Sequence, residues 1–306
     1  MKPEKIWIDW VCYGVGMLLI ALLGQTVEAS LLGWGILLAA GLAGRGCWGL
    51  ARAYQGWIPP LLTLLLGLLL MQTLLVGYGI PPGLMPTPSR VVRALWTARA
   101  VLLKDSLQTF GREATAGWVA GIGGGILLGL GLTRFGWLGQ GLIPYLAIFS
   151  SIPIPALAPV VVGALGVEWP SKAVIAALVV LFPVVINTVR GVESVNHDHL
   201  DLMRSYAADP RQDFQYLRWP QAQPYLFHAA KLAATLAVIA AIVGEFFGAP
   251  GYGLGFRIKI EAARFNFDIV WAAIVYVTVL STVVYLVLVW LEKRFVFWHS
   301  SVRVDG

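Results

Sequence analysis

Charge is scarce in this chain: only 12% of its 306 residues are Asp, Glu, Lys or Arg, about half the share of an average soluble domain. Four histidines and two cysteines leave little material for acid–base chemistry, a metal site or a disulfide framework. The sequence also lacks the Gly-x-x-x-x-Gly-Lys-Ser/Thr loop that binds nucleotide phosphates, and the Gly-x-Ser-x-Gly and His-Glu-x-x-His motifs of hydrolases. We therefore expect no catalytic residue, no metal and no cofactor, and no ATP bound by the chain itself in the usual way.

Apolar residues make up 58% of the chain and gather in long runs. A helix needs about 20 apolar residues to cross a bilayer core, and lipid offers no partners to an unpaired backbone. We therefore predict an all-α polytopic membrane protein with about eight transmembrane helices, at 6–24, 29–50, 57–80, 106–133, 139–163, 171–192, 224–247 and 268–291. The net charge of +6 is spread over the loops, so we expect contact with the lipid bilayer and none with nucleic acid.

The distribution of positive charge predicts the orientation. An even number of spans places both termini on one side, and the basic residues that fall there are Lys2, Lys5, Arg45, Arg52, Arg134, Lys293, Arg294 and those of the segment 190–223. Because cytoplasmic loops carry the excess of Lys and Arg, we predict cytoplasmic termini, including the tail 301–306, although basic residues also occur on the other side. Asp9 interrupts the first apolar run and a second run follows directly, so we interpret the first as a retained helix rather than a cleaved signal.

Two of the predicted spans are rich in glycine or proline. Gly117, Gly121, Gly125 and Gly129 recur every four residues, which favours close helix packing, either within the chain or between two copies. The next span carries Pro153, Pro155 and Pro159 after Ser150 and Ser151. Each interior proline leaves a carbonyl without its helical donor, and in a membrane such a helix belongs beside protein or a watery path. A kinked helix lining a translocation route is our interpretation, with a merely structural kink as the alternative.

Polar residues in the later spans are few. Glu245 is the ionisable residue that is hardest to explain as part of the membrane interface. The candidate translocation path therefore consists of Ser150, Ser151, Pro153, Pro155, Asn187 and Glu245. The nearby glycine-rich run 251–255 has Phe256 where a dinucleotide-binding fingerprint requires glycine, so we predict a turn or gate element there.

A charged segment of about thirty residues, 190–223, lies between two long apolar runs and must be in water. Leu200, Met203 and Ala207 have helical spacing, and Asp209, Pro210 and Gln212 have the pattern of a new helix start with a capping box. Pro220 and Pro224 are expected to end this second helix. His197-Asp198-His199 are adjacent, a spacing that rarely converges on one metal. Two short helices with an elbow predict a docking surface.

The same segment resembles the coupling motif of permease subunits of binding-protein-dependent ABC importers: Glu-Ala-Ala, three residues, Gly, nine residues, Ile-x-Leu-Pro. The matching positions here are Asp201, Leu202, Met203, Ala207, Leu217, Trp219 and Pro220, with only the proline identical. Family-like patterns surround it in order, including 152–159, 231–233, 245–248 and 253–255. The similarity covers about 57–300 and is strongest to the branch that imports nitrate, taurine, sulfonates and pyrimidine or flavin precursors.

The resemblance implies a type I importer permease core at 57–300, two additional helices in 1–56, and a cytoplasmic coupling loop at 193–222. It implies docking of a separate ABC ATPase subunit on Asp201, Leu202, Met203, Ala207, Asp209, Leu217 and Pro220. It also implies a solute-binding protein on the outer side, a second permease copy, and a location in the bacterial inner membrane. In place of the family's glycine stands Ala207, so we expect Asp209 and Pro210 to supply the bend. A riboflavin or pyrimidine precursor is the favoured solute, with taurine, sulfonates or nitrate as alternatives and a stand-alone secondary transporter as the rival class.

Overall fold

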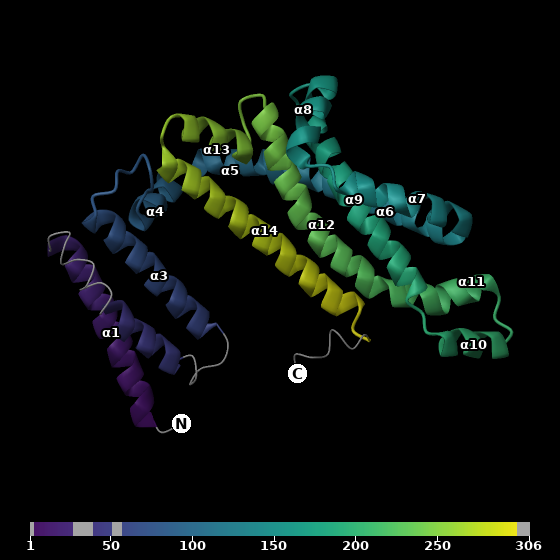
Figure 1. Cartoon of the computed structure of the whole chain (residues 1–306), viewed down its shortest axis with the longest axis horizontal. Helices are drawn as coiled ribbons and strands as arrows, with labels where there is room; N and C mark the ends of the chain where they lie inside the picture. Colours follow the sequence, from purple (N-terminus) through teal and green to yellow (C-terminus); the bar gives the residue numbers. More distant parts are fainter. Residues whose placement is uncertain (1–2, 27–38, 51–56, 299–306) are drawn as a thin grey trace. The chain divides into compact units, whose positions relative to one another are not determined.

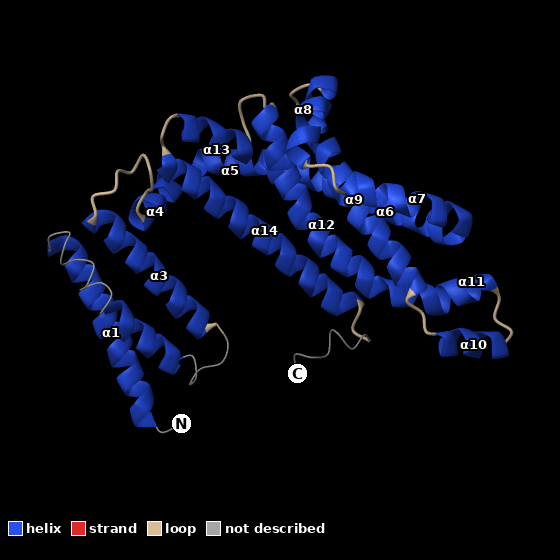
Figure 2. Cartoon of the chain, in the orientation of Figure 1, coloured by secondary structure: helices blue, strands red, loops and turns tan. Residues whose placement is uncertain are grey.

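The computed structural model describes residues 3–26, 39–50 and 57–298. Every regular element in these ranges is a helix, and none of their residues forms a strand (Figure 1, Figure 2). The all-α prediction is therefore confirmed. The chain forms two compact units, residues 1–99 with 261–272 and residues 100–260 with 273–306.

Five helical stretches in the described ranges are long and apolar enough to cross a membrane: Ile58–Gly77, Arg99–Arg134, Trp169–Glu193, Pro210–Phe247 and Phe267–Phe295. They correspond to the third, fourth, sixth, seventh and eighth predicted spans. The first predicted span lies within α1, Pro3–Thr26. The second, 29–50, is helical from residue 39, and its earlier part lies outside the described residues.

The fifth predicted span is broken rather than kinked. Helix α7 runs from Gly136 to Ser150 and α8 from Ile154 to Leu165, and the two are bent by 94°. Pro153 is extended, at ψ 129°, and precedes the first turn of α8. Ile152, which precedes Pro153, is disfavoured in the α conformation, and Pro153 has no N–H with which to continue α7, so the helix is interrupted here.

The first unit contains α1, the helix 39–50, α3 (Ile58–Gly77) and α4 (Pro88–Thr97). Tyr13 of α1 donates a hydrogen bond to the carbonyl of Leu62 at 2.7 Å, and the buried Cys47 contacts Thr63 at 3.2 Å. The backbone of Ser89 donates to Gln72 Oε1 at 3.0 Å, which connects the start of α4 to α3. The segment that follows Pro81, Pro82 and Pro86 thus forms a short helix.

In the second unit, α5 (Arg99–Gln108), the π-helix η1 (Thr109–Ala114) and α6 (Thr115–Arg134) form one continuous stretch that packs on α9 (Trp169–Glu193). The four glycines at four-residue intervals are buried and face α9. A Cβ atom on Gly121 would lie 2.6 Å from Val180 Cγ1, and one on Gly125 would lie 2.7 Å from Val184 Cβ. The glycine face therefore packs within the chain, one of the two alternatives left open by the sequence.

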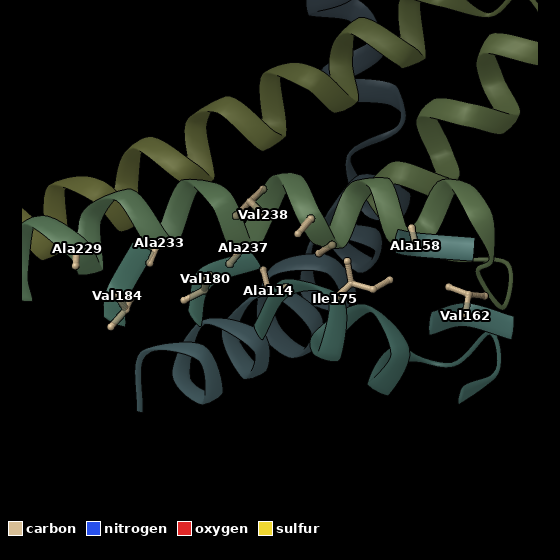
Figure 3. Close-up of a cluster of buried hydrophobic side chains, with 13 residues drawn as sticks. Ala114, Ala158, Val162, Ile175, Val180, Val184, Ala229, Ala233, Ala237 and Val238 are labelled. Atoms are coloured by element: carbon tan, nitrogen blue, oxygen red, sulfur yellow. The ribbon is translucent and has the colours of Figure 1, made fainter. Parts of the chain in front are cut away.

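Helices α9 and α12 (Trp219–Phe247) form the centre of this unit together with α8. Their facing side chains are small or β-branched, and Figure 3 shows the cluster they form: Ala158, Val162, Ile175, Val180, Val184, Ala229, Ala233, Ala237 and Val238. Small residues allow helix backbones to approach closely, which compensates for the weak hydrophobic force inside lipid.

Helix α14 (Phe267–Phe295) joins α12 through a polar contact as well as apolar ones. Lys231 Nζ lies 2.6 Å from Glu292 Oε2, and the two side chains are only 17% and 15% exposed. Because an unpaired charge is costly at this burial, the pair joins the middle of α12 to the end of α14.

Candidate functional site

The charged segment between α9 and α12 contains two short helices, as predicted. Helix α10 runs from His197 to Ser205, and Asn196 caps its first turn by accepting a hydrogen bond from the backbone of Asp198. No residue of α10 is buried. Figure 1 shows it beside α11 at the end of the α9 and α12 pair. The helix is therefore available to a partner along its length.

Leu202, one of the expected docking residues, and Tyr206 are the most exposed apolar side chains of α10 and its C-cap. Leu202 is 53% and Tyr206 76% exposed, whereas Leu200 and Met203 are half-buried. Leu202 and Tyr206 are four residues apart, so they lie on one face of the helix. The sequence shows the spacing of both pairs, Leu202 with Tyr206 and Leu200 with Met203. Which pair is exposed depends on how α10 packs against the rest of the second unit.

The bend after α10 is made by Ala207 itself, which corrects the expectation that Asp209 and Pro210 replace the family's glycine. Ala207 has φ 53°, in the left-handed region. Its N–H donates to Arg204 O at 2.9 Å and that of Ala208 donates to Met203 O at 3.0 Å. This is a Schellman helix end, whose left-handed position is usually glycine. Alanine adopts the same conformation here at a steric cost.

Helix α11 (Pro210–Asp213) starts with the predicted capping box. Asp209 Oδ1 accepts from the backbone of Gln212 at 2.8 Å, and Gln212 Oε1 accepts from the backbone of Asp209 at 3.0 Å. The predicted end of this helix is wrong. The π-helix η2 (Phe214–Arg218) leads directly into α12, with Pro220 in its first turn and Pro224 inside. The helical stretch nevertheless continues to Phe247, with both prolines inside it, where each lacks the N–H that a helical residue donates.

The candidate path residues fall into separate places. Ser150 ends α7, Ser151 lies in the break, and Pro153 and Pro155 flank the start of α8. Asn187 donates to the carbonyl of Pro183 on its own helix at 2.8 Å. The stacked rings of Phe149 and Phe182, with centroids 6.0 Å apart, join the end of α7 to α9.

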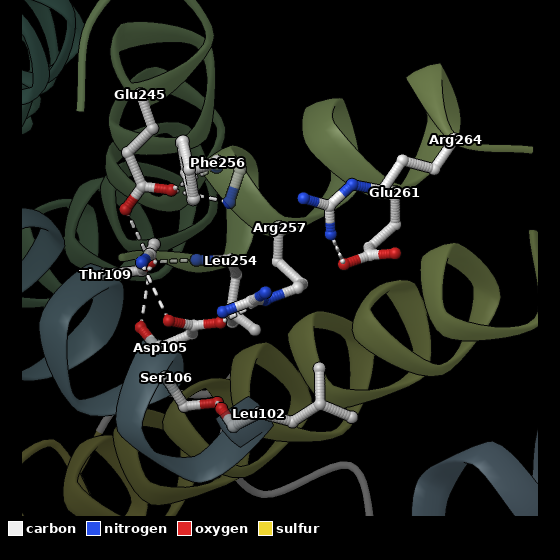
Figure 4. A network of polar contacts seen from close by, with 12 residues as sticks. Leu102, Asp105, Ser106, Thr109, Glu245, Leu254, Phe256, Arg257, Glu261 and Arg264 are labelled. Atoms are coloured by element: carbon white, nitrogen blue, oxygen red, sulfur yellow. Dashed lines mark hydrogen bonds and ion pairs between the residues drawn. The ribbon is translucent and has the colours of Figure 1, made fainter. Parts of the chain in front are cut away.

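Glu245 belongs to a buried polar network. It is 1% exposed, and its carboxylate accepts hydrogen bonds from the hydroxyl of Thr109 at 2.6 Å and from the backbones of Gly255 and Phe256 (Figure 4). Thr109 also accepts from the backbone of Leu254 at 2.8 Å. The carboxylate thus joins α12 to η1 and to the first turn of α13 (Leu254–Ala263).

A second carboxylate of the network holds the glycine-rich turn. Asp105 accepts from the backbone of Gly253 at 3.0 Å and from Arg257 Nε at 2.8 Å. Gly251 and Gly253 have φ 101° and 122°, which only glycine adopts readily. A Cβ atom on Gly253 would collide with the carboxylate of Glu245. The run 251–255 is therefore a turn, as expected, and its amides bind carboxylates rather than a nucleotide.

Two further ionisable residues are fully buried beside this network. Glu113 Oε1 accepts from Gln108 Nε2 at 3.0 Å, and Lys172 donates to the carbonyls of Val167 and Glu168. Sequence reasoning missed Lys172, Asp105 and Thr109. The sequence did offer one indication for Lys172, because a lysine inside the predicted apolar span 171–192 is costly unless it has a function or a partner.

Comparison with known proteins agrees with this architecture. Residues 121–297 match the family model of the binding-protein-dependent transport system inner membrane component. The chain is 30% identical over 241 residues to the riboflavin transport system permease protein RibX of Chloroflexus aurantiacus, covering 78% of this chain and 89% of the relative. The chain belongs to this family of ABC importer permeases.

Two other relatives extend the comparison of this permease. It is 30% identical over 257 residues to the formylaminopyrimidine transport permease protein ThiX of Halalkalibacterium halodurans, covering 82% of this chain and 99% of the relative. It is 29% identical over 226 residues to the putative aliphatic sulfonates transport permease protein SsuC of Escherichia coli, covering 71% and 83%. It is a multi-pass inner-membrane transport component rather than an enzyme.

The residues expected to dock the ATPase lie along one continuous part of this permease. Asp201, Leu202 and Met203 are on α10, Ala207 is in the Schellman turn, Asp209 caps α11, Leu217 is in η2 and Pro220 begins α12. Contact of these residues with an ATPase stays a prediction.

Proposed function

We propose that this permease forms the transmembrane path of an ATP-driven importer and receives the force of ATP hydrolysis through α10. The proposal rests on one observation: α10 is exposed and is directly connected to a helix long enough to span the membrane. No residue of α10 is buried, and the helical stretch that follows it, from Pro210 to Phe247, is continuous. A push on α10 is therefore transmitted to α12 through one short turn.

The chemistry of α10 suits a protein partner. Leu202 and Tyr206 present an apolar face, and Asp201 and Arg204 form an exposed ion pair at 3.0 Å. Aromatic and aliphatic anchors within a polar rim are typical of protein interfaces. The partner is a soluble ATPase subunit, because this chain has no phosphate-binding loop of its own.

Affinity purification of the tagged permease from its own gently solubilised membranes tests this assignment. We expect an ABC ATPase to copurify in equal amount and to be lost on Leu202→Asp or Tyr206→Asp, and also on Met203→Asp. The matched control is Tyr216→Asp, which changes a 67% exposed tyrosine on η2 and is expected to retain the ATPase. A pure permease without ATPase, under conditions that preserve known complexes, would move the assignment to a stand-alone secondary transporter.

For the solute we propose a riboflavin or pyrimidine precursor, delivered by a solute-binding protein. RibX and ThiX, each 30% identical, carry these solute classes in their names. The candidate path residues include no cation that would attract taurine, sulfonates or nitrate. The test is a thermal shift of the cognate binding protein with riboflavin, formylaminopyrimidine, taurine and nitrate. Stabilisation by taurine or nitrate alone would refute the proposed solute class.

The assembly we propose contains two copies of this permease, with both termini in the cytoplasm. Positive charge at both ends of the chain supports this orientation. Cysteine labelling from each side of sealed vesicles, at positions in the tail 301–306, tests it. Labelling from the outer side would show that the orientation is the opposite one and that α10 lies on the side of the membrane without ATP.

A further inference from the structure

A cavity of about 970 Å³ opens between the end of α6 and the charged segment 190–223, which we call the docking segment. Its walls come from the ends of α6 and α9, from α11 and η2, and from the first residue of α12. All of these elements belong to the second unit. The cavity is distinct from α10, since no residue of α10 lines it.

Three of the five charged side chains that line this cavity are basic. Arg134, Arg211 and Arg218 line it, together with the acidic Glu193 and Asp213. Arg218 Nε is bound by Asp213 Oδ2 at 2.7 Å. Arg134 and Arg211 are exposed and form no ion pair with any described residue. Two arginines, from α6 and from α11, are thus free to bind an anion.

The rest of the wall is apolar. Leu130, Val192, Phe214 and Trp219 contribute to it, and the rings of Phe214 and Trp219 lie 6.1 Å apart. Arg134 is the last residue of a membrane-crossing stretch, and Trp219 begins the apolar part of another. Arginine and tryptophan at the ends of spans mark the level of lipid headgroups. The cavity therefore offers cations at headgroup depth and apolar surface next to them.

We propose that this cavity binds the phosphate headgroup of an anionic phospholipid, with Arg134 and Arg211 as the phosphate ligands. Guanidinium groups bind phosphate through paired N–H donors, and basic pockets between membrane helices on the cytoplasmic side suit anionic headgroups. The apolar wall accommodates the first part of an acyl chain. A bound headgroup joins the end of α6 to α11 and so steadies the docking segment. The inference does not depend on which solute is carried.

The test is native mass spectrometry of the full chain in detergent micelles, titrated with phosphatidylglycerol and, separately, with phosphatidylcholine. We expect selective binding of phosphatidylglycerol. Arg134→Gln and Arg211→Gln should each weaken it about fivefold, and the double variant about 25-fold, since one basic residue contributes about this factor near an anionic surface. Arg190→Gln is the matched control, because Arg190 is exposed on the same end of α9 and does not line the cavity; it should bind as the unchanged chain does.

Three results would overturn the proposal. The first is equal phosphatidylglycerol affinity in the double variant, with an unchanged melting temperature. The second is displacement of the lipid by millimolar inorganic phosphate or glycerol 3-phosphate, which would identify a site for a soluble phosphate. The third is loss of a copurifying protein from the double variant while lipid binding persists, which would make the cavity a protein interface.

Discussion

Replacement of Gly121 by alanine tests the packing that holds the second unit together. The added Cβ would lie 2.6 Å from Val180 Cγ1 and 2.8 Å from the carbonyl of Ala177. Val180 is branched at Cβ and cannot rotate freely in a helix, and a carbonyl cannot move without its helix. Helices α6 and α9 must separate, at a cost of about 1–3 kcal/mol for overpacking a filled core.

Gly123 provides the matched control on the same helix. A Cβ there meets nothing within 4 Å, so Gly123→Ala changes helix propensity by about 1 kcal/mol, as Gly121→Ala does, without the collision. The difference in unfolding free energy between the two variants is therefore the cost of the collision with α9. At about 2–4 °C per kcal/mol, the Tm of Gly121→Ala in the same detergent should be about 2–12 °C below that of Gly123→Ala. Equal Tm values would refute the close α6–α9 contact.

Three other changes probe contacts elsewhere in the chain. Thr109→Val leaves the buried N–H of Leu254 unpaired and should cost about 1–3 kcal/mol of unfolding free energy, with faster amide exchange at that residue. Ala207→Gly relieves a left-handed alanine and should stabilise the end of α10 by about 0.5–1 kcal/mol, measured by hydrogen exchange. Lys231→Met and Glu292→Gln should be non-additive by about 0.5–3 kcal/mol in a double-mutant cycle of thermal unfolding.

Each of these has a control that separates it from a general loss of stability. Thr115→Val removes an exposed hydroxyl that contacts only its own helix and should be nearly silent; an equal effect of both threonine changes would contradict the network. Ala207→Val should weaken protection of α10, and protection equal to that of Ala207→Gly would show that the turn is not left-handed. Additive effects in the Lys231 and Glu292 cycle would mean that the pair does not form.

Several features could be predicted from local sequence because their cause is local. The capping box at Asp209 needs only residues within one turn of each other. The glycine face of α6 follows from a four-residue repeat, and the membrane class follows from run length. The end of the helix at Pro220 was predicted wrongly because the cause is not local. A proline removes a backbone donor and usually ends a helix, but packing of α12 against α8 and α9 stabilises the helix beyond it.

The sequence by itself determined the all-α membrane class, most of the spans, the family and the two short helices between α9 and α12, since hydropathy, spacing and turn chemistry are carried by neighbouring residues. Only the tertiary structure decided that Asp105, Thr109 and Glu245 meet around the turn at 251–255. These contacts join residues more than a hundred positions apart, and no local pattern pairs them. It also decided which face of α10 is exposed, because burial depends on what each helix packs against.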